Sequence, residues 1–245
     1  MLSARHLSYF VSDVHLGLPV RDPEARERRF VRFLKEIPAQ ETEALYLLGD
    51  IWDFWYEYKD VVPKGSVRVL SALLDLMDAG VKVYFFPGNH DGWTFSYFEE
   101  LGMVKLNQPY AVEIGNKRFC LGHGDGLGPG NHWYKFVKAL FNQRWAQALF
   151  SMLHPRIAFQ WATGWSHRSR SGKPISYVFK GADEPLYKFC EEYLTHYPVN
   201  FFIFGHYHSR VDMPVGAARL LMLGDWMTAP NWIVFDAATG AVSIH

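Results

Sequence analysis

The chain is poor in cysteine, has no long apolar run and carries no excess charge of either sign. Its two cysteines, Cys120 and Cys190, are too few for a disulfide framework. Their apolar surroundings predict buried free thiols, as in proteins of a reducing compartment. No run approaches the roughly 18 apolar residues of a membrane-spanning helix. Residues 1–5 lead straight into an expected strand without an apolar signal segment. We therefore expect a cytoplasmic protein without a spanning helix.

A formal net charge of zero argues against nucleic-acid binding through overall charge. By contrast, 49% of the 245 residues are hydrophobic, which is enough to bury a large core and excludes a disordered chain. We expect a single domain spanning residues 1–245, with one insertion at about 131–180.

Five apolar, strand-like runs each end in Asp, Asn or His, and four of these ends lie beside glycine. One such residue after a strand is usually a turn or cap residue. Five such strand ends predict that these side chains come together at one site, because open α/β sheets bind ligands at the carboxyl ends of their strands. Oxygen and nitrogen donors without a thiolate suit Mn, Fe or Zn. The residues are, in chain order, Asp13, His15, Asp50, Asn89, His90, Asp91, His123, Asp125, His206 and His208.

The order of predicted elements indicates a mixed α/β fold. A β-α-β-α-β opening predicts parallel strands, and the closely spaced strands after it predict a second, antiparallel or mixed sheet. Asp22-Pro23 and Ser66 are expected to begin two helices, and Gly80 to end the second. The strands are expected at 9–11, 44–48, 81–86, near 104, at 110–114, 117–121, 201–204, 219–223, 232–235 and 241–244, with further helices at 94–101 and 184–197.

Residues 131–180, which we call the cap, break this alternation. They hold eight Lys or Arg and no Asp or Glu, whereas the rest of the chain holds 17 basic and 25 acidic residues. They also hold four of the nine tryptophans. Apolar residues at helical spacing predict two amphipathic helices, with Trp133, Phe136, Val137, Leu140 and Phe141 on one, and Trp145, Ala148, Leu149, Met152 and Leu153 on the other.

Taken in order from Asp13 to His208, the five blocks resemble the calcineurin-like metallophosphoesterase superfamily. The resemblance implies a four-layer α/β/β/α sandwich and two divalent metal ions, with Mn first and Fe or Zn as other choices. One metal would take Asp13, His15, Asp50 and His208, and the other Asp50, Asn89, His123 and His206, so that Asp50 bridges them. Such a pair lowers the pKa of water and offsets charge on a phosphoryl group under in-line attack.

Neighbouring residues have roles implied by position. His90 matches the superfamily histidine that contacts the phosphate and can protonate the leaving oxygen, and we expect Asp91 to fix its tautomer. Asp53 and Asp125 either orient metal-binding imidazoles or are turn and cap residues. The aromatic residues that follow Asp50 either pack in the core or line one wall of the site; they are Trp52, Phe54, Trp55, Tyr56 and Tyr58.

Within the superfamily the chain is most similar to the UDP-2,3-diacylglucosamine diphosphatases of the lipid A pathway. This resemblance rests on residues 49–55, on His123-Gly124-Asp125 and on the insertion that follows. It implies release of UMP and 2,3-diacylglucosamine 1-phosphate by a protein peripherally associated with the inner membrane. The expected substrate contacts are Asn89, His90, His167, Arg168, Arg170, Lys173, Trp133, Phe136 and Leu140. The chain departs from the better-known members by having His90 where they have Arg.

Two other functions remain open at this point. The first is a phosphodiesterase or nuclease acting on soluble nucleotides or DNA, against which the zero net charge and the apolar cap both count. The second is an inactive binding scaffold, against which the complete donor set counts. The basic run around His167 is either a solvated loop or a clamp for a polyphosphate, since Arg binds phosphate oxygens in bidentate fashion.

Overall fold

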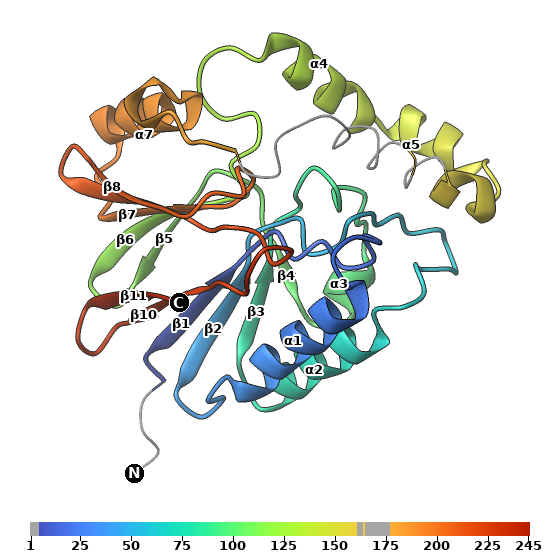
Figure 1. Cartoon of the computed structure of the whole chain (residues 1–245), viewed down its shortest axis with the longest axis horizontal. Coiled ribbons are helices and arrows are strands. Elements are labelled where there is room, and N and C mark those ends of the chain that lie inside the picture. Colours follow the sequence, from blue (N-terminus) through green and yellow to red (C-terminus); the bar gives the residue numbers. More distant parts are fainter. Residues whose placement is uncertain (1–4, 161–163, 165–176) are drawn as a thin grey trace.

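The structure is a computed structural model that describes residues 5–160, 164 and 177–245. Two sheets face each other (Figure 1). The first has the strand order β11-β10-β1-β2-β3-β4, and the second β5-β6-β7-β9-β8. The strands are β1 (Leu7–Val11), β2 (Thr42–Leu47), β3 (Lys82–Phe85), β4 (Val104–Lys105), β5 (Tyr110–Ile114), β6 (Lys117–Leu121), β7 (Phe201–Phe204), β8 (Val211–Val215), β9 (Ala218–Met222), β10 (Ile233–Asp236) and β11 (Ala241–Ile244).

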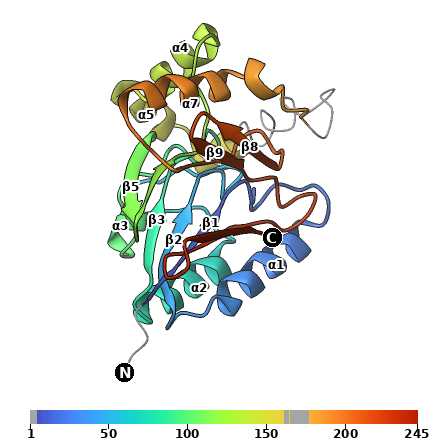
Figure 2. The same ribbon diagram turned by 90° about the vertical axis from the view of Figure 1, so that its left-hand side faces the viewer.

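Three layers of apolar side chains separate four layers of secondary structure. Helices α1 (Pro23–Glu36) and α2 (Val67–Asp78) pack on the outer face of the first sheet. Aromatic and aliphatic residues such as Phe10, Phe119 and Phe235 fill the space between the sheets. Helix α7 (Pro185–His196) covers the second sheet through Leu186 and Cys190. Figure 2 shows these layers with α1 and α2 on one side and α7 on the other. The predicted α/β/β/α sandwich is confirmed.

The first sheet is parallel from β1 to β4, and β10 and β11 join it antiparallel. In the second sheet β6, β7 and β9 run parallel, whereas β5 and β8 pair antiparallel at its edges. The predicted mixed second sheet is therefore confirmed. Strand β8 was not expected from the sequence, because Pro214 interrupts its run and proline within a sheet is confined to edges and bulges.

The starts of α1 and α2 agree with the predictions from the sequence, although Ser66 does not cap α2 with its side chain. The carboxylate of Asp22 accepts a hydrogen bond from Ala25 N at 2.9 Å, and Pro23 occupies the first turn of α1. Ser66 precedes α2, but its side chain caps no backbone N–H. Its hydroxyl instead accepts a hydrogen bond from Trp52 Nε1 at 2.7 Å, which ties α2 to the loop after β2. The predicted helix at 94–101 is shorter, as α3 (Tyr97–Glu100).

The cap helices lie outside the sandwich (Figure 1). They are α4 (His132–Phe141) and α5 (Arg144–Ser151), and residues 155–160 are also helical. A 3-10 turn, η1 (Gly181–Asp183), leads from the cap into α7. Neither α4 nor α5 contains a buried residue. The cap is attached to the core by hydrogen bonds and by aromatic contacts, such as those of Phe150 with Tyr56 and Trp93.

Candidate metal centre

The candidate metal ligands gather where the parallel strands of both sheets end. Asp13 and His15 follow β1, Asp50 follows β2, Asn89 follows β3, His123 follows β6, and His206 and His208 follow β7. The parallel strands of each sheet present their carboxyl ends at one edge, and because the two sheets face each other, three loops of the first sheet meet two of the second. Ligands that lie 195 positions apart in sequence thus become neighbours.

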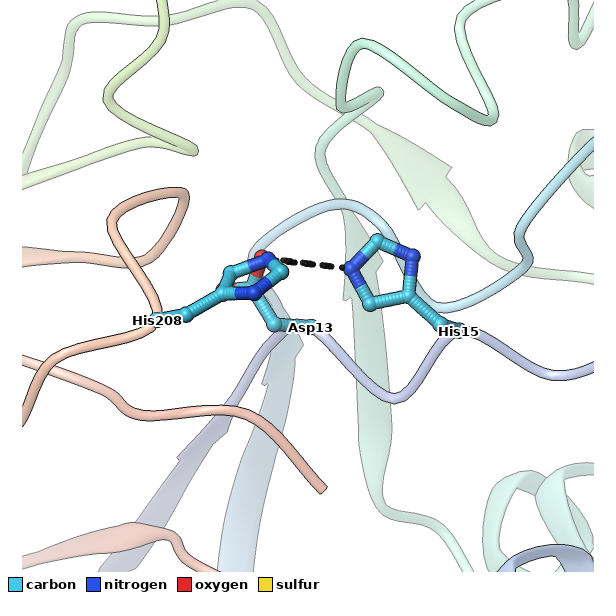
Figure 3. Close-up of side chains that lie close together, drawn as sticks. All are labelled: Asp13, His15 and His208. Carbon is cyan, nitrogen blue, oxygen red and sulfur yellow. Dashed lines mark hydrogen bonds and ion pairs between the residues drawn. The ribbon is translucent and has the colours of Figure 1, made fainter. Parts of the chain in front are cut away.

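Asp13, His15 and His208 form the first group (Figure 3). His15 Nε2 lies 3.1 Å from His208 Nε2 and 3.8 Å from Asp13 Oδ1, and His208 Nε2 lies 3.2 Å from Asp13 Oδ1. In Figure 3 the two imidazoles and the carboxylate point toward one another. Each residue therefore offers one donor atom to a common point.

Asp50, His123 and His206 form the second group. His123 Nε2 lies 3.3 Å from Asp50 Oδ2 and 3.3 Å from Asn89 Oδ1, so Asn89 joins this group. Asp50 Oδ2 is also 3.9 Å from His15 Nε2 of the first group. One carboxylate oxygen thus faces both groups, which is the position that a bridging ligand of two metals requires.

The unsatisfied atoms of the centre fit bound cations. Asp13 Oδ1 is buried, and no hydrogen bond with favourable geometry reaches it from the described residues. His123 Nδ1 lies 2.9 Å from the carbonyl oxygen of Leu48 and must carry a hydrogen there, which leaves Nε2 as the nitrogen that faces Asp50. His15 Nδ1 faces Asp53 Oδ1 at 3.3 Å, which likewise leaves Nε2 for the centre. Such partners on the other nitrogen orient metal-binding histidines.

The charges of the centre are strongly perturbed. Burial lowers the pKa of His15 and of His206 to about 4, so both are neutral near pH 7, as metal ligands must be. Burial acts in the same direction on His123, but the carboxylate of Asp50 outweighs it and raises the pKa of His123 to about 10. Burial would raise the pKa of Asp13, yet His208 lowers it to about 2. The carboxylates of Asp13 and Asp50 and the imidazolium of His123 are thus charged. A bound cation would neutralise the carboxylates and replace the proton of the imidazolium.

The backbone around the centre is strained. Five of the candidate ligands have left-handed backbone angles that non-glycine residues rarely adopt, with φ of 50–71° at Asp13, His15, Asp50, His206 and His208. Such strain clusters at functional sites, where the surrounding structure enforces it. The chain at positions 88 and 205 passes so close to Asp50 and Asp13 respectively that both positions must be glycine, because a Cβ there would collide with these residues. The left-handed backbone angles and the two glycines thus help to place the side chains of the candidate ligands.

His90 is held by Asp53 and not by Asp91. Its Nδ1 lies 3.0 Å from the carbonyl oxygen of Asp53 and 3.4 Å from Asp53 Oδ1. A carbonyl only accepts, so Nδ1 carries a hydrogen and Nε2 is the nitrogen left for a substrate. Asp53 also faces His15, and therefore orients the ring of a candidate ligand and that of His90.

The prediction that Asp91 fixes the tautomer of His90 is wrong. The buried Asp91 carboxylate accepts hydrogen bonds from four backbone N–H groups, those of Gly88, Asp50, Ile51 and Trp52, at 2.7–3.2 Å. These bonds join the loop after β3 to the loop after β2. Asp91 thus holds the loops that carry Asp50 and Asn89, and the bonds of the His90 ring in the described structure go to Asp53.

Asp125 makes no hydrogen bond to a metal-binding imidazole in the described part of the chain, so its first predicted role is not observed. Its carboxylate instead contacts Gln108, Tyr134 and Lys138. The other alternative, a turn residue, is correct for its backbone, because Asp125 lies in a turn; its side chain is in addition fully buried.

Arg26 is a residue that sequence reasoning missed. It is fully buried, and its guanidinium donates to the carbonyl oxygens of His15 at 2.9 Å, Leu18 at 2.6 Å and Val20 at 3.2 Å. These bonds hold the loop that presents His15. A signal was available, since Arg26 lies one turn before Phe30 on the apolar face of α1, where a charged residue needs a buried partner.

Aromatic residues after Asp50 pack in the core and hold the cap. The prediction of core packing is confirmed for Trp52 and Trp55, and the alternative that these residues line the site stays a prediction. Trp52 and Trp55 are buried in the core. Tyr56 donates a hydrogen bond to the Gln147 carbonyl at 2.8 Å, and Tyr58 donates one to the Leu153 carbonyl at 3.3 Å. From the loop after β3, Trp93 Nε1 donates to the Phe141 carbonyl at 3.0 Å.

The expected apolar contacts of the cap lie on its surface. Trp133 is 76% exposed, Phe136 59% and Leu140 38%, and the Trp133 and Phe136 rings stack at 5.8 Å. Trp145 and Leu149 of α5 are exposed as well, as is Met152 directly after it. We call Trp133, Phe136 and Leu140 the α4 stripe. The remaining expected contacts, His167, Arg168, Arg170 and Lys173, lie outside the described residues.

Comparison with known proteins agrees with this geometry. The calcineurin-like phosphoesterase family profile matches residues 8–210. The chain belongs to the calcineurin-like phosphoesterase family. A UDP-2,3-diacylglucosamine hydrolase of Porphyromonas gingivalis is 38% identical over 94% of each chain, and one of Haemophilus influenzae is 30% identical over 89% of this chain and 90% of its own. A dimetal phosphatase from Danio rerio shares the fold, with a TM-score of 0.50, 16% identity and coverage of 94% and 92%.

The family assignment confirms the predicted enzyme class, a metal-dependent phosphoester hydrolase. It also confirms that divalent metals are the cofactors, although it leaves their identity open. No helix in the described ranges is long and apolar enough to cross a bilayer.

Proposed function

We propose that the protein hydrolyses the pyrophosphate of UDP-2,3-diacylglucosamine and releases UMP and 2,3-diacylglucosamine 1-phosphate. The observation that carries the proposal is an exposed aromatic stripe on α4, a helix bonded directly to the loop of the candidate ligand His123. A phosphoesterase for small soluble substrates has no need for such a surface, whereas two acyl chains need apolar surface to cover them. The names of the Porphyromonas and Haemophilus relatives support the same substrate.

Asp13, His15, Asp50 and His208 would hold one divalent cation, and Asp50, Asn89, His123 and His206 the other. When bound, two such cations lower the pKa of water and offset the charge that develops on the phosphoryl oxygens. We propose Mn as the metal, because imidazole, carboxylate and amide donors without thiolate suit it.

His90 supplies the proton for the leaving group in this proposal. A water oxygen forms a new bond to the uridine-side phosphorus, and the bond from that phosphorus to the bridging oxygen breaks. The bridging oxygen leaves with the sugar phosphate and takes a proton from His90 Nε2. For this step the His90 ring carries a hydrogen on each nitrogen, and the attacking water gives its own proton to the solvent. Asp53 holds the opposite nitrogen at 3.0 Å from its carbonyl oxygen, which fixes the ring for this transfer. Asn89, beside His90, is proposed to contact the same phosphate.

The cap supplies recognition. The α4 stripe is proposed to cover acyl chains, at about 25 cal/mol for each Å² of apolar surface removed from water. By charge alone, His167, Arg168, Arg170 and Lys173 are candidates to bind the substrate phosphates.

A lipid substrate also implies work at a membrane surface. The cap has exposed apolar side chains, and residues 131–180 hold eight basic and no acidic side chains. We propose partial, salt-sensitive association with the inner membrane from the cytoplasmic side. Flotation with anionic vesicles tests this, and equal recovery with vesicles at low and high salt would count against an electrostatic part.

The function is tested with purified protein and Mn(II) offered three substrates: UDP-2,3-diacylglucosamine, bis-p-nitrophenyl phosphate and single-stranded DNA. We expect the highest kcat/KM on the glycolipid. Preference for DNA or for the small diester, with two metals bound, would favour a nuclease or phosphodiesterase. Two bound metals without turnover of any substrate would favour a binding scaffold.

A further inference from the structure

Asp125 connects the loop of a candidate ligand to the cap. It lies two residues after His123, and its side chain is fully buried. On the core side, Gln108 Nε2 donates to Asp125 Oδ1 at 2.7 Å and to the Asp125 carbonyl at 2.9 Å. Gln108 Oε1 accepts from Gly124 N at 2.6 Å. The loop from His123 to Asp125 is thereby fixed to the connection between β4 and β5.

On the cap side, two residues of α4 bind the other oxygen of the same carboxylate. Tyr134 Oη and Lys138 Nζ each donate to Asp125 Oδ2 at 2.6 Å. They lie four residues apart, so they share one face of the helix. We call Asp125, Gln108, Tyr134 and Lys138 the Asp125 latch.

The latch determines which face of α4 is turned outward. At about 100° per residue, the α4 stripe lies on the side of the helix opposite Tyr134 and Lys138. No side chain of the helix is fully buried, so its packing on the core is limited and its polar bonds matter more for its rotation. A charged hydrogen bond to a buried carboxylate is strong and directional, and is therefore suited to that task.

We propose that the Asp125 latch holds α4 beside the loop of His123 with the α4 stripe turned outward, and that Lys138 and Tyr134 are positioning residues that determine specificity for the acylated substrate. This inference rests on the proposed function. The loss of Lys138 would leave the metal loop held by Gln108, while α4 would lose its charged bond to that loop and keep the bonds of Tyr134, Lys135 and Phe141. With fewer bonds, α4 would turn and shift more easily. The stripe would then be displaced from the acyl chains, although the donors around Asp50 would keep their places.

The test compares Lys138→Met with wild type on two substrates. We expect kcat/KM for UDP-2,3-diacylglucosamine to fall by about 10–100-fold, mostly through KM, because a shift of about 1 Å in a positioning element can cost 10²-fold. Bis-p-nitrophenyl phosphate should be cleaved within about twofold of wild type, and two metals should stay bound. Lys138→Arg should restore much of the loss. Lys188→Met, an exposed helical lysine on α7, is the matched control.

A second readout does not depend on the substrate. Amide hydrogen exchange of peptides from α4 should become at least about tenfold faster in Lys138→Met, whereas peptides from β1 and β2 should be unchanged. If wild type fails to cleave the glycolipid but α4 loosens in the variant, the proposed function fails and the positioning role stands. Unchanged exchange in α4, or equal loss of activity on both substrates, would overturn the latch.

Discussion

At Asp50 a single carboxylate oxygen serves both groups of candidate metal ligands. Asp50→Asn should therefore reduce the metal content from two ions to at most one, and lower kcat by on the order of 10³-fold, because an amide bridges two cations poorly. Metal analysis and steady-state kinetics measure this. Asp60→Asn, in an exposed part of the same loop, is the control. Two metals and near-normal turnover in Asp50→Asn would rule out the bridging role.

His90 has a different expected signature, because it lies beside the ligands and is bonded to Asp53. His90→Ala should lower kcat by about 10²–10⁴-fold, the usual range for a lost general acid, and should leave two metals bound. His196→Ala, at an exposed position at the end of α7, should match wild type. Loss of a metal would make His90 a ligand, and an unchanged rate would make it structural.

His123 couples metal binding to pH. In the metal-free protein Asp50 raises the pKa of His123 to about 10, so at pH 8 its ring carries a proton that a metal must displace. Metal affinity should therefore rise with pH from 7 to 10. Titration calorimetry in buffers of different ionisation enthalpy should show release of about one proton per chain or more. Binding without proton release would contradict this assignment.

The sequence was a reliable guide to which residues meet, and a poorer one to what each side chain contacts. The residues after five strands could be placed at one sheet edge, because parallel strands end there. The role predicted for Asp91 from its neighbours in the sequence was nevertheless wrong, and the first role predicted for Asp125 is not observed in the described residues. The oxygens of Asp91 accept from backbone N–H groups, and Oδ2 of Asp125 contacts the cap. Those directions depend on loop conformations, including left-handed backbone at Asp13 and Asp50, that local pattern does not specify.

At the scale of elements, the α4 stripe is the feature that separates a lipid substrate from a soluble one. Replacing Trp133, Phe136 and Leu140 together with Ser should raise KM for UDP-2,3-diacylglucosamine at least about tenfold, since each side chain buried in the complex contributes on the order of 1 kcal/mol or more. Stability should hardly change, because all three are exposed.

Cleavage of bis-p-nitrophenyl phosphate by the triple variant provides the internal reference and should stay near the wild-type rate. Val61→Ser with Val67→Ser, two exposed apolar residues outside the cap, is the matched control. An equal effect of both replacements on the glycolipid would show that the stripe has no special part in recognition.

Elements with local signals were predicted well. Helices α1 and α7 have apolar periodicity and an early proline, and β1, β2 and β3 are short, largely apolar runs. Strand β8 lacks such a signal, because its partner β9 and not its own sequence makes it a strand. The amphipathic pattern of α4 was recognised, but whether its apolar face packs inward or stays exposed depends on bonds such as that from Lys138 to Asp125.

At the scale of the whole molecule, the sandwich brings loops from both sheets to one edge and places the cap next to them. The contacts of Tyr56, Trp93 and Lys138 each join a loop that follows a candidate ligand to a cap helix. Catalysis and substrate recognition are thereby linked in one chain: the sheets position the metal ligands, and the same loops position the surface proposed for the acyl chains.

The most direct test of this account is hydrolysis of UDP-2,3-diacylglucosamine by the Mn(II)-loaded protein in water enriched in oxygen-18, followed by mass spectrometry of both products. Attack on the uridine-side phosphorus predicts one labelled oxygen in UMP and none in 2,3-diacylglucosamine 1-phosphate. Label in the sugar phosphate, or no cleavage of the glycolipid by protein that holds two metals, would contradict the account.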